Sequence, residues 1–97
     1  MERADAEKEL IRLREAIDRV DEVLVKLLNQ RALYAVEIGE IKGHLAMPIY
    51  SPEREKDVLH HVESECRGPL DAAAIRRLFE RIIDESRRVE RESANRD

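Results

Sequence analysis

Apolar side chains recur along residues 10–43 at steps of three and four, which is the spacing of one face of an α-helix. They are Leu10, Leu13, Ile17, Val20, Leu24 and Leu27, followed by Tyr34, Ile38 and Ile41. This row, which we call the seam, predicts a helix from about Leu10 to Gly43 that packs along its whole length. Residues 1–9 are polar and either fray or extend the helix.

One position in the seam carries a charge. The alternation places Arg31 between Leu27 and Tyr34, and a guanidinium in an apolar seam is costly unless an anion pairs with it. Lys42 follows about three turns later, so it projects from nearly the same face. Two cations aimed at the interior of a helix bundle indicate a buried site for an anion.

The length of this helix predicts a second copy of the chain. At ~1.5 Å per residue the helix would run roughly 50 Å, whereas a compact domain of this size is only about 33 Å across. One chain of 97 residues cannot cover such a helix on all sides. We therefore expect much of the seam to pack against another copy of the chain.

A second helix is expected after a break at residues 43–52. Gly43 can serve as the C-cap of the first helix. Ser51, Pro52 and Glu53 are typical of an N-cap, a first-turn proline and a favourable early acid. The second helix should cover about residues 52–66, and its apolar stripe is Val58, Leu59, Val62 and Cys66.

A third helix should follow the break at residues 67–69, with Asp71 as its N-cap. Its apolar stripe is Ile75, Leu78, Phe79, Ile82 and Ile83. The same face continues onto Ser86 and Glu90, so it changes from apolar to hydrogen-bonding near the end of the chain. Inside the first helix, Gly39 costs ~1 kcal/mol relative to alanine. It either allows another backbone or a ligand to come close, or it is merely tolerated.

Composition favours one helical domain over residues 1–97. Charged residues make up 41% and hydrophobic residues 42% of the chain, and the net charge of -4 argues against nucleic acid as a partner. No apolar run approaches the ~20 residues that span a bilayer, and the N-terminus lacks a signal-peptide pattern, so we expect a cytoplasmic protein without membrane contact. Cys66 is the only cysteine and is expected to be a small buried residue.

Other chemistry has little support in the sequence. His44, His60 and His61 lack the spacing of metal ligands, so we expect surface or structural histidines and no metal. The arginines of the third helix alternate with acidic residues, which is typical of a solvated, salt-bridged face. These arginines are Arg76, Arg77, Arg81, Arg87, Arg88 and Arg91.

The candidate site consists of five polar residues on inward or flanking faces, namely Arg31, Lys42, Glu55, Ser86 and Glu90. Singly, each has an ordinary structural explanation, such as a core ion pair for Arg31. Together they can surround one cavity, because the connections between helices can bring them close. Arg14 lies ~25 Å from Arg31 along a straight helix. It could join the same small site only from a second chain in an antiparallel two-fold dimer.

Three segments carry a resemblance to a known family. LREAIDRVDEVLVKLLNQRALYAVEIGEIK, YSPEREKDVL and IRRLFERIIDESRRVE together resemble the all-helical class of chorismate mutases, over about residues 10–92. The resemblance implies an intertwined homodimer of three-helix protomers with shared active sites. It also implies conversion of chorismate to prephenate by an intramolecular Claisen rearrangement in aromatic amino-acid biosynthesis, without metal or cofactor.

The resemblance also assigns roles to residues. Arg14 of the other protomer and Arg31 would grip the carboxylates of the substrate. Lys42 would reach a carboxylate and the ether oxygen of the breaking bond. Glu90, a position often occupied by glutamine, would donate a hydrogen bond to that oxygen. We expect Arg31, Lys42 and Glu90 to be the catalytic residues.

The remaining matches line the substrate. Arg54 and Glu55 correspond to an Arg–Glu pair in which the glutamate accepts a hydrogen bond from the ring hydroxyl. Ser86 matches a serine of the site, and Ser51 takes a place where some members have aspartate. Two other functions remain open: the related helical lyase that removes pyruvate from isochorismate, and a non-catalytic dimerisation module with Arg31 and Lys42 in buried ion pairs.

Overall fold

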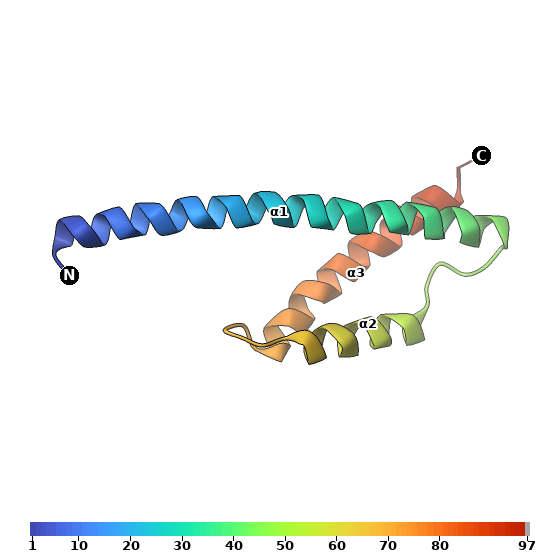
Figure 1. Ribbon diagram of the computed structural model, residues 1–97. Helices are drawn as coiled ribbons and strands as arrows, with labels where there is room; N and C mark the ends of the chain where they lie inside the picture. Colours follow the sequence, from blue (N-terminus) through green and yellow to red (C-terminus); the bar gives the residue numbers. More distant parts are fainter. Residues whose placement is uncertain (97) are drawn as a thin grey trace. The chain divides into compact units, whose positions relative to one another are not determined.

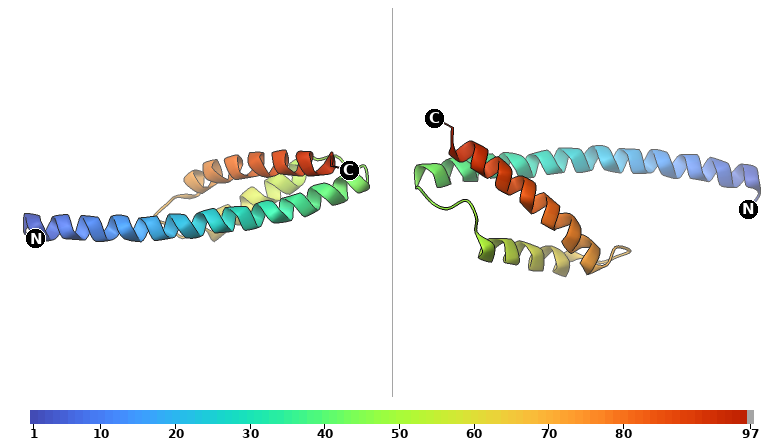
Figure 2. Two further views of the ribbon diagram at one scale, coloured as in Figure 1. Left: turned by 90° about the horizontal axis from the view of Figure 1, so that it is seen from above. Right: turned by 180° about the vertical axis from the view of Figure 1, so that it is seen from behind.

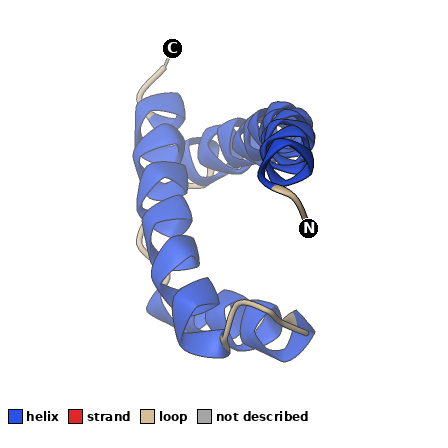
Figure 3. Cartoon of the chain, turned by 90° about the vertical axis from the view of Figure 1, so that its left-hand side faces the viewer, coloured by secondary structure: helices blue, strands red, loops and turns tan. Residues whose placement is uncertain are grey.

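The computed structural model describes residues 1–96, which form three α-helices and no strand (Figures 1 and 3). The helices are α1 (Arg3–His44), α2 (Pro52–Glu65) and α3 (Ala72–Ala94). The all-α, three-helix expectation with one long N-terminal helix is therefore confirmed. Residues 3–9 are helical, so they extend the first helix.

The chain divides into two compact units, Met1–Arg31 and Ala32–Asp97, and each is described by itself. The first unit is the N-terminal part of α1. Its seam residues are between 46% and 57% exposed, namely Leu10, Leu13, Ile17, Val20, Leu24 and Leu27. The seam of this unit is thus an apolar surface about half open to solvent. A single domain over residues 1–97 stays a prediction.

In the second unit, α3 passes the C-terminal end of α1 with the two backbones in contact (Figure 2). A Cβ added at Gly39 would overlap the carbonyl oxygen of Glu90 and lie 2.7 Å from its Cα. A Cβ added at Gly43 would lie 2.6 Å from the carbonyl oxygen of Ala94. Of the two explanations for Gly39, the close approach of another backbone is confirmed.

The end of α1 differs from the expectation. Gly43 is not a C-cap but lies inside the helix, which ends at His44, because α3 needs its missing side chain. The left-handed residue after the helix is Ala46, with a φ of 53°. The amide of Met47 donates to the carbonyl of Lys42 at 2.8 Å, and the amide of Ala46 donates to Gly43 at 3.3 Å. These two bonds form a helix-ending motif that usually has glycine at the left-handed position.

Both later helices begin where the sequence predicts. Ser51 is the N-cap of α2 and Pro52 occupies its first turn, although the Ser51 side chain makes no capping hydrogen bond. Asp71 is the N-cap of α3, and its carboxylate accepts a hydrogen bond from the amide of Ala74 at 2.7 Å. α2 ends at Glu65, one residue earlier than expected.

The core of the second unit is small and draws one apolar residue from each helix. These residues are Ala35 of α1, Leu59 of α2 and Ile83 of α3. Ser93 is only 2% exposed, and its hydroxyl donates to the carbonyl of Val89 at 2.8 Å, so it is satisfied within α3. Such internal bonding allows a polar side chain to lie in a packed interface.

Two side chains expected in the core are more open than the stripes indicate. Leu78 of α3 is 54% exposed, because it lies at the edge of the stripe, while Ile83 takes the buried position. Cys66 is half-buried at the end of α2, and its thiol donates to the carbonyl of Leu70 at 2.9 Å. The helical period thus identifies the packed face but not its edges.

We expect Gly39→Ala to destabilise the protein, although alanine favours helix by ~1 kcal/mol. The new methyl group would meet backbone atoms of Glu90, which cannot rotate away. The steric cost should therefore approach the upper end for overpacking, about 3 kcal/mol. Urea denaturation measures the difference, and Glu40→Ala, at an exposed neighbouring position of α1, controls for helix propensity. An unchanged or raised midpoint for Gly39→Ala would contradict the backbone contact.

Candidate functional site

The contact between α1 and α3 places Lys42 beside Glu90. Nζ of Lys42 lies 2.8 Å from Oε1 of Glu90, and each side chain is 16% exposed. The contact is therefore a mostly buried ion pair, in which the ammonium group of Lys42 neutralises the carboxylate of Glu90.

Lys42 is held by a second contact. Its Nζ donates to the backbone carbonyl of Ile49 at 2.9 Å, so the side chain spans from α1 to the connection before α2. This hydrogen bond and the ion pair with Glu90 come from different segments, and together they orient the ammonium group. The group has three N–H donors, so it can contact a ligand while the lysine stays in position.

Glu55 of α2 is bound by Arg87 of α3 through both carboxylate oxygens. The distances are 2.6 Å from Nη2 to Oε1 and 3.0 Å from Nε to Oε2. The guanidinium also lies over the ring of Tyr50, with Cζ 5.1 Å from the ring centroid. The hydrogen bonds to Glu55 raise the pKa of Arg87 above its ordinary value, because they stabilise its charged form.

These two ion pairs lie close together along α3. Arg87 and Glu90 are three residues apart and therefore neighbours on one side of the helix, about one turn from each other. Ser86 lies between the packed face and this side, half-buried, and its hydroxyl donates to the carbonyl of Ile82 at 2.9 Å. Residues 86–90 of α3 therefore contain or contact four of the predicted site residues, namely Lys42, Glu55, Ser86 and Glu90.

The other predicted site residues lie around these pairs or in the first unit. Arg54 is exposed on α2 next to Glu55, and Ser51 is half-buried at the start of the same helix. Arg14 is exposed, and Arg31 is half-buried at the end of the first unit. Within the second unit, Lys42 and Glu90 are therefore in contact. Arg14 and Arg31 belong to the first unit.

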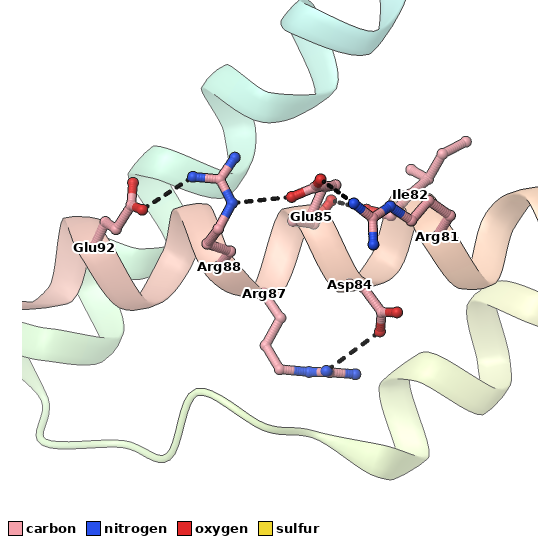
Figure 4. Close-up of polar contacts among 8 residues, drawn as sticks. Arg81, Ile82, Asp84, Glu85, Arg87, Arg88 and Glu92 are labelled. Atoms are coloured by element: carbon pink, nitrogen blue, oxygen red, sulfur yellow. Dashed lines mark hydrogen bonds and ion pairs between the residues drawn. The ribbon is translucent and has the colours of Figure 1, made fainter.

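Arg87 is the residue that sequence analysis misinterpreted. It was assigned to the solvated face of α3, whereas its side chain is only 26% exposed and contacts another helix. Figure 4 shows it on the opposite side of α3 from a row formed by Arg81, Glu85, Arg88 and Glu92. Arg87 lies next to Ser86 and three residues before Glu90, and this spacing places it near the inward face of α3. The surrounding run of charged residues favoured a solvated face instead.

The row itself is the salt-bridged face that the sequence predicts. Arg88 contacts Glu85 and Glu92 at 2.9 Å each, and Arg81 contacts Glu85 at 3.0 Å. The hydrogen bond from Arg88 and the charge of Arg81 hold the pKa of Glu85 below its ordinary value. Glu85 therefore stays ionised, and this face is a structural network on the surface of α3.

The described residues offer neither a cluster of metal ligands nor a membrane-spanning helix. His44, His60 and His61 are exposed, as expected. Within residues 1–96, no group of three or more His, Cys, Asp or Glu side chains could hold a metal ion. None of the described helices combines the length and the apolar character needed to cross a bilayer.

Comparison with known proteins adds the family. A family model for chorismate mutase type II matches residues 13–91. A bifunctional chorismate mutase/prephenate dehydratase of Neisseria gonorrhoeae is 44% identical over 82 residues, which cover 84% of this chain. The chain spans only 22% of the length of that relative.

Two solved structures resemble the fold. A chorismate mutase from Thermus thermophilus aligns with a TM-score of 0.83 and 34% identity, covering 84% of this chain and 93% of that one. A chorismate mutase from Helicobacter pylori, solved in complex with prephenate, aligns with a TM-score of 0.81 and 28% identity, covering 89% of this chain and 93% of that one.

The Lys42–Glu90 pair predicts a non-additive pair of substitutions. Lys42→Met leaves the mostly buried carboxylate of Glu90 without its cation, and Glu90→Leu leaves the ammonium without its anion, so each should lower the free energy of unfolding by about 1–3 kcal/mol. The double variant should lose less than the sum, because neither charge then remains unpaired. Urea denaturation of all four proteins measures the coupling. Strict additivity would argue against the ion pair.

Proposed function

The chain belongs to the chorismate mutase type II family, and we propose that it converts chorismate to prephenate in aromatic amino-acid biosynthesis. The observation that carries the proposal is the mostly buried pairing of Lys42 with Glu90, two residues that the family resemblance assigns to the substrate site. An ammonium group held in such a position is suited to bind an anionic ligand. The prephenate bound by the Helicobacter pylori relative supports the same class of ligand.

The reaction is a Claisen rearrangement within one molecule, so it needs no nucleophile, metal or cofactor. The protein has to hold a dianion in its compact, reactive conformer and stabilise the negative charge that develops on the ether oxygen. Positioning and preorganised electrostatics supply both effects. A site made of cations and hydrogen-bond donors is therefore sufficient for the chemistry.

Three cationic side chains bind different parts of the substrate. Arg31 and the Arg14 of a second copy grip the two carboxylates, for which the fork of a guanidinium is well suited. Lys42 approaches a carboxylate and the ether oxygen. Its contact with the carbonyl of Ile49 fixes the position of the ammonium group, which leaves little reorganisation for the moment of reaction.

The remaining residues orient the ring. Glu55 accepts a hydrogen bond from the ring hydroxyl, with Arg54 beside it on α2. Ser86 lines the site one helical turn before Glu90, and Ser51 contributes at the start of α2. These assignments rest on the family positions, and the half-buried side chains of Ser51, Glu55 and Ser86 are compatible with them.

Glu90 has two states with different consequences. Ionised, it pairs with Lys42 and offers the ether oxygen only a repelling charge. Protonated, it releases Lys42 and can donate a hydrogen bond to that oxygen. The protonated form is therefore the active one in this proposal.

We also propose an intertwined homodimer in which each site is shared between chains. The half-exposed seam of residues 10–27 supports it, because a second copy would remove these apolar side chains from water. A two-fold interface places each residue against a distant residue of the partner, and the reverse. The exposed Arg14 of one chain can thereby complete the site of the other.

The function is tested by incubating the purified protein with chorismate and, separately, with isochorismate. We expect prephenate from chorismate. Release of pyruvate from isochorismate alone would instead identify the related lyase. Turnover of neither substrate by the folded protein would favour a dimerisation module and overturn the proposal.

The shared site is tested by mixing two variants, Arg14→Ala and Arg31→Ala, that should each be folded and nearly inactive. A heterodimer has one site with both defects and one site with neither. Mixing should therefore restore part of the activity, which is measured as chorismate consumption. If subunits exchange, as shown by mass spectrometry of tagged chains, and no activity returns, the sites are not shared.

The role of Glu90 predicts the effect of two substitutions. Glu90→Gln keeps the length of the side chain and supplies a permanent amide donor to the ether oxygen, so the variant should keep or exceed the wild-type kcat/KM. Glu90→Leu supplies no donor and should lose most of the activity. The measurement is kcat/KM for chorismate with all three proteins. An unchanged value for a folded Glu90→Leu variant would exclude Glu90 as the donor.

A further inference from the structure

Arg87 joins three segments that are far apart in the sequence. Its guanidinium binds both carboxylate oxygens of Glu55 on α2 and lies over the ring of Tyr50 in the connection before α2. A further contact runs to Asp84, one turn earlier on α3, at 3.4 Å. None of the family positions named above assigns a role to Arg87, yet it is the cross-helix partner of a residue that the proposed function places against substrate.

The contact between Arg87 and Glu55 is less exposed than the ion pairs on the surface of α3. The side chains of Arg87 and Glu55 are 26% and 24% exposed, whereas that of Arg88 is 57% exposed. Two parallel N–H···O bonds fix the plane of the carboxylate, and a cation over an aromatic face fixes the plane of the guanidinium. The orientation of the Glu55 carboxylate is therefore set from α3.

The contact with Arg87 does not use all the acceptor positions of the Glu55 carboxylate. An ionised carboxylate offers about four acceptor positions, and Arg87 uses one on each oxygen. Each oxygen of Glu55 thus keeps an acceptor position in a direction that Arg87 determines. The raised pKa of Arg87 keeps the guanidinium charged throughout the range of any enzyme assay.

We propose that Arg87 is a positioning residue, which holds the Glu55 carboxylate oriented to accept the hydrogen bond from the ring hydroxyl of the substrate. The inference rests on the proposed function and deepens it, because it names the device that aims one of the substrate contacts. Tyr50 takes part because its ring lies against the guanidinium and limits its movement. A lysine at position 87 could supply charge but not the two-pronged contact.

The experiment compares two substrates, chorismate and an analogue that lacks the ring hydroxyl. We expect Arg87→Met to lower kcat/KM for chorismate roughly tenfold, with little effect on the analogue. Arg87→Lys should fall between the wild type and Arg87→Met on chorismate. In a Glu55→Gln background, Arg87→Met should add little further loss, because the carboxylate that it positions is already gone.

Arg88→Met is the matched control, since it removes an arginine with two carboxylate contacts from the next position of α3 without touching Glu55. It should leave both substrates unaffected. Circular dichroism and urea denaturation establish folding, and if Arg87→Met does not fold, Arg87→Lys carries the comparison.

The outcomes distinguish this inference from the proposed function. Equal losses on both substrates, or no loss on either, in a folded Arg87 variant would overturn the positioning role while wild-type turnover of chorismate upholds the mutase. A further full loss in the Glu55→Gln background would overturn it as well. A folded wild type that converts neither substrate would overturn the proposed function, and with it the role of Arg87.

Discussion

The backbone contact between α1 and α3 determines where Lys42 and Glu90 meet. Gly39 and Gly43 are one turn apart, so together they form a strip of α1 without side chains against which Glu90 and Ala94 lie. At this separation a lysine on α1 and a glutamate on α3 reach each other directly. Any side chain on the strip would push the helices apart and lengthen that contact. The position of the ion pair is thus a consequence of two absent side chains.

The second unit balances its internal charges in pairs. Lys42 is matched by Glu90 and Arg87 by Glu55, so neither carboxylate is left without a cation before a substrate arrives. Uncompensated charges at these depths would weaken folding, because burial is unfavourable for an isolated ion. Under the proposed function, the pairing allows the chain to fold with neutralised charges before a dianionic substrate binds. It also gives each cation a fixed position before binding, which reduces the reorganisation that binding requires.

Local sequence signals predicted the helices well but their partners poorly. Asp71 and the Ser51–Pro52 pair mark helix starts because capping depends on a few neighbouring residues. The seam indicated a long helix, and Gly39 raised the question of a close approach. The role of Gly43 was predicted wrongly because a glycine near a helix end can serve either as a C-cap or as the point where another backbone comes close. Only the path of α3 decides between the two. Arg87 was misjudged because the charge pattern of one helix does not reveal which side of it meets another helix. The roles proposed for Arg14 and Arg31 rest on the family resemblance alone.

The connection between α1 and α2 has an unusual constraint for a surface loop. The amide of Met47 donates to the backbone carbonyl of Lys42, and the carbonyl of Ile49 accepts from the Lys42 side chain. At the end of the connection, the ring of Tyr50 packs against the guanidinium of Arg87. Loops ordinarily tolerate insertions because few contacts fix their length. Here an inserted residue would break the register between these three contacts and remove the Ile49 carbonyl that helps to orient Lys42. Variation in the length of this segment should therefore be rare among active homologues, and a library that randomises it should keep the number of residues fixed.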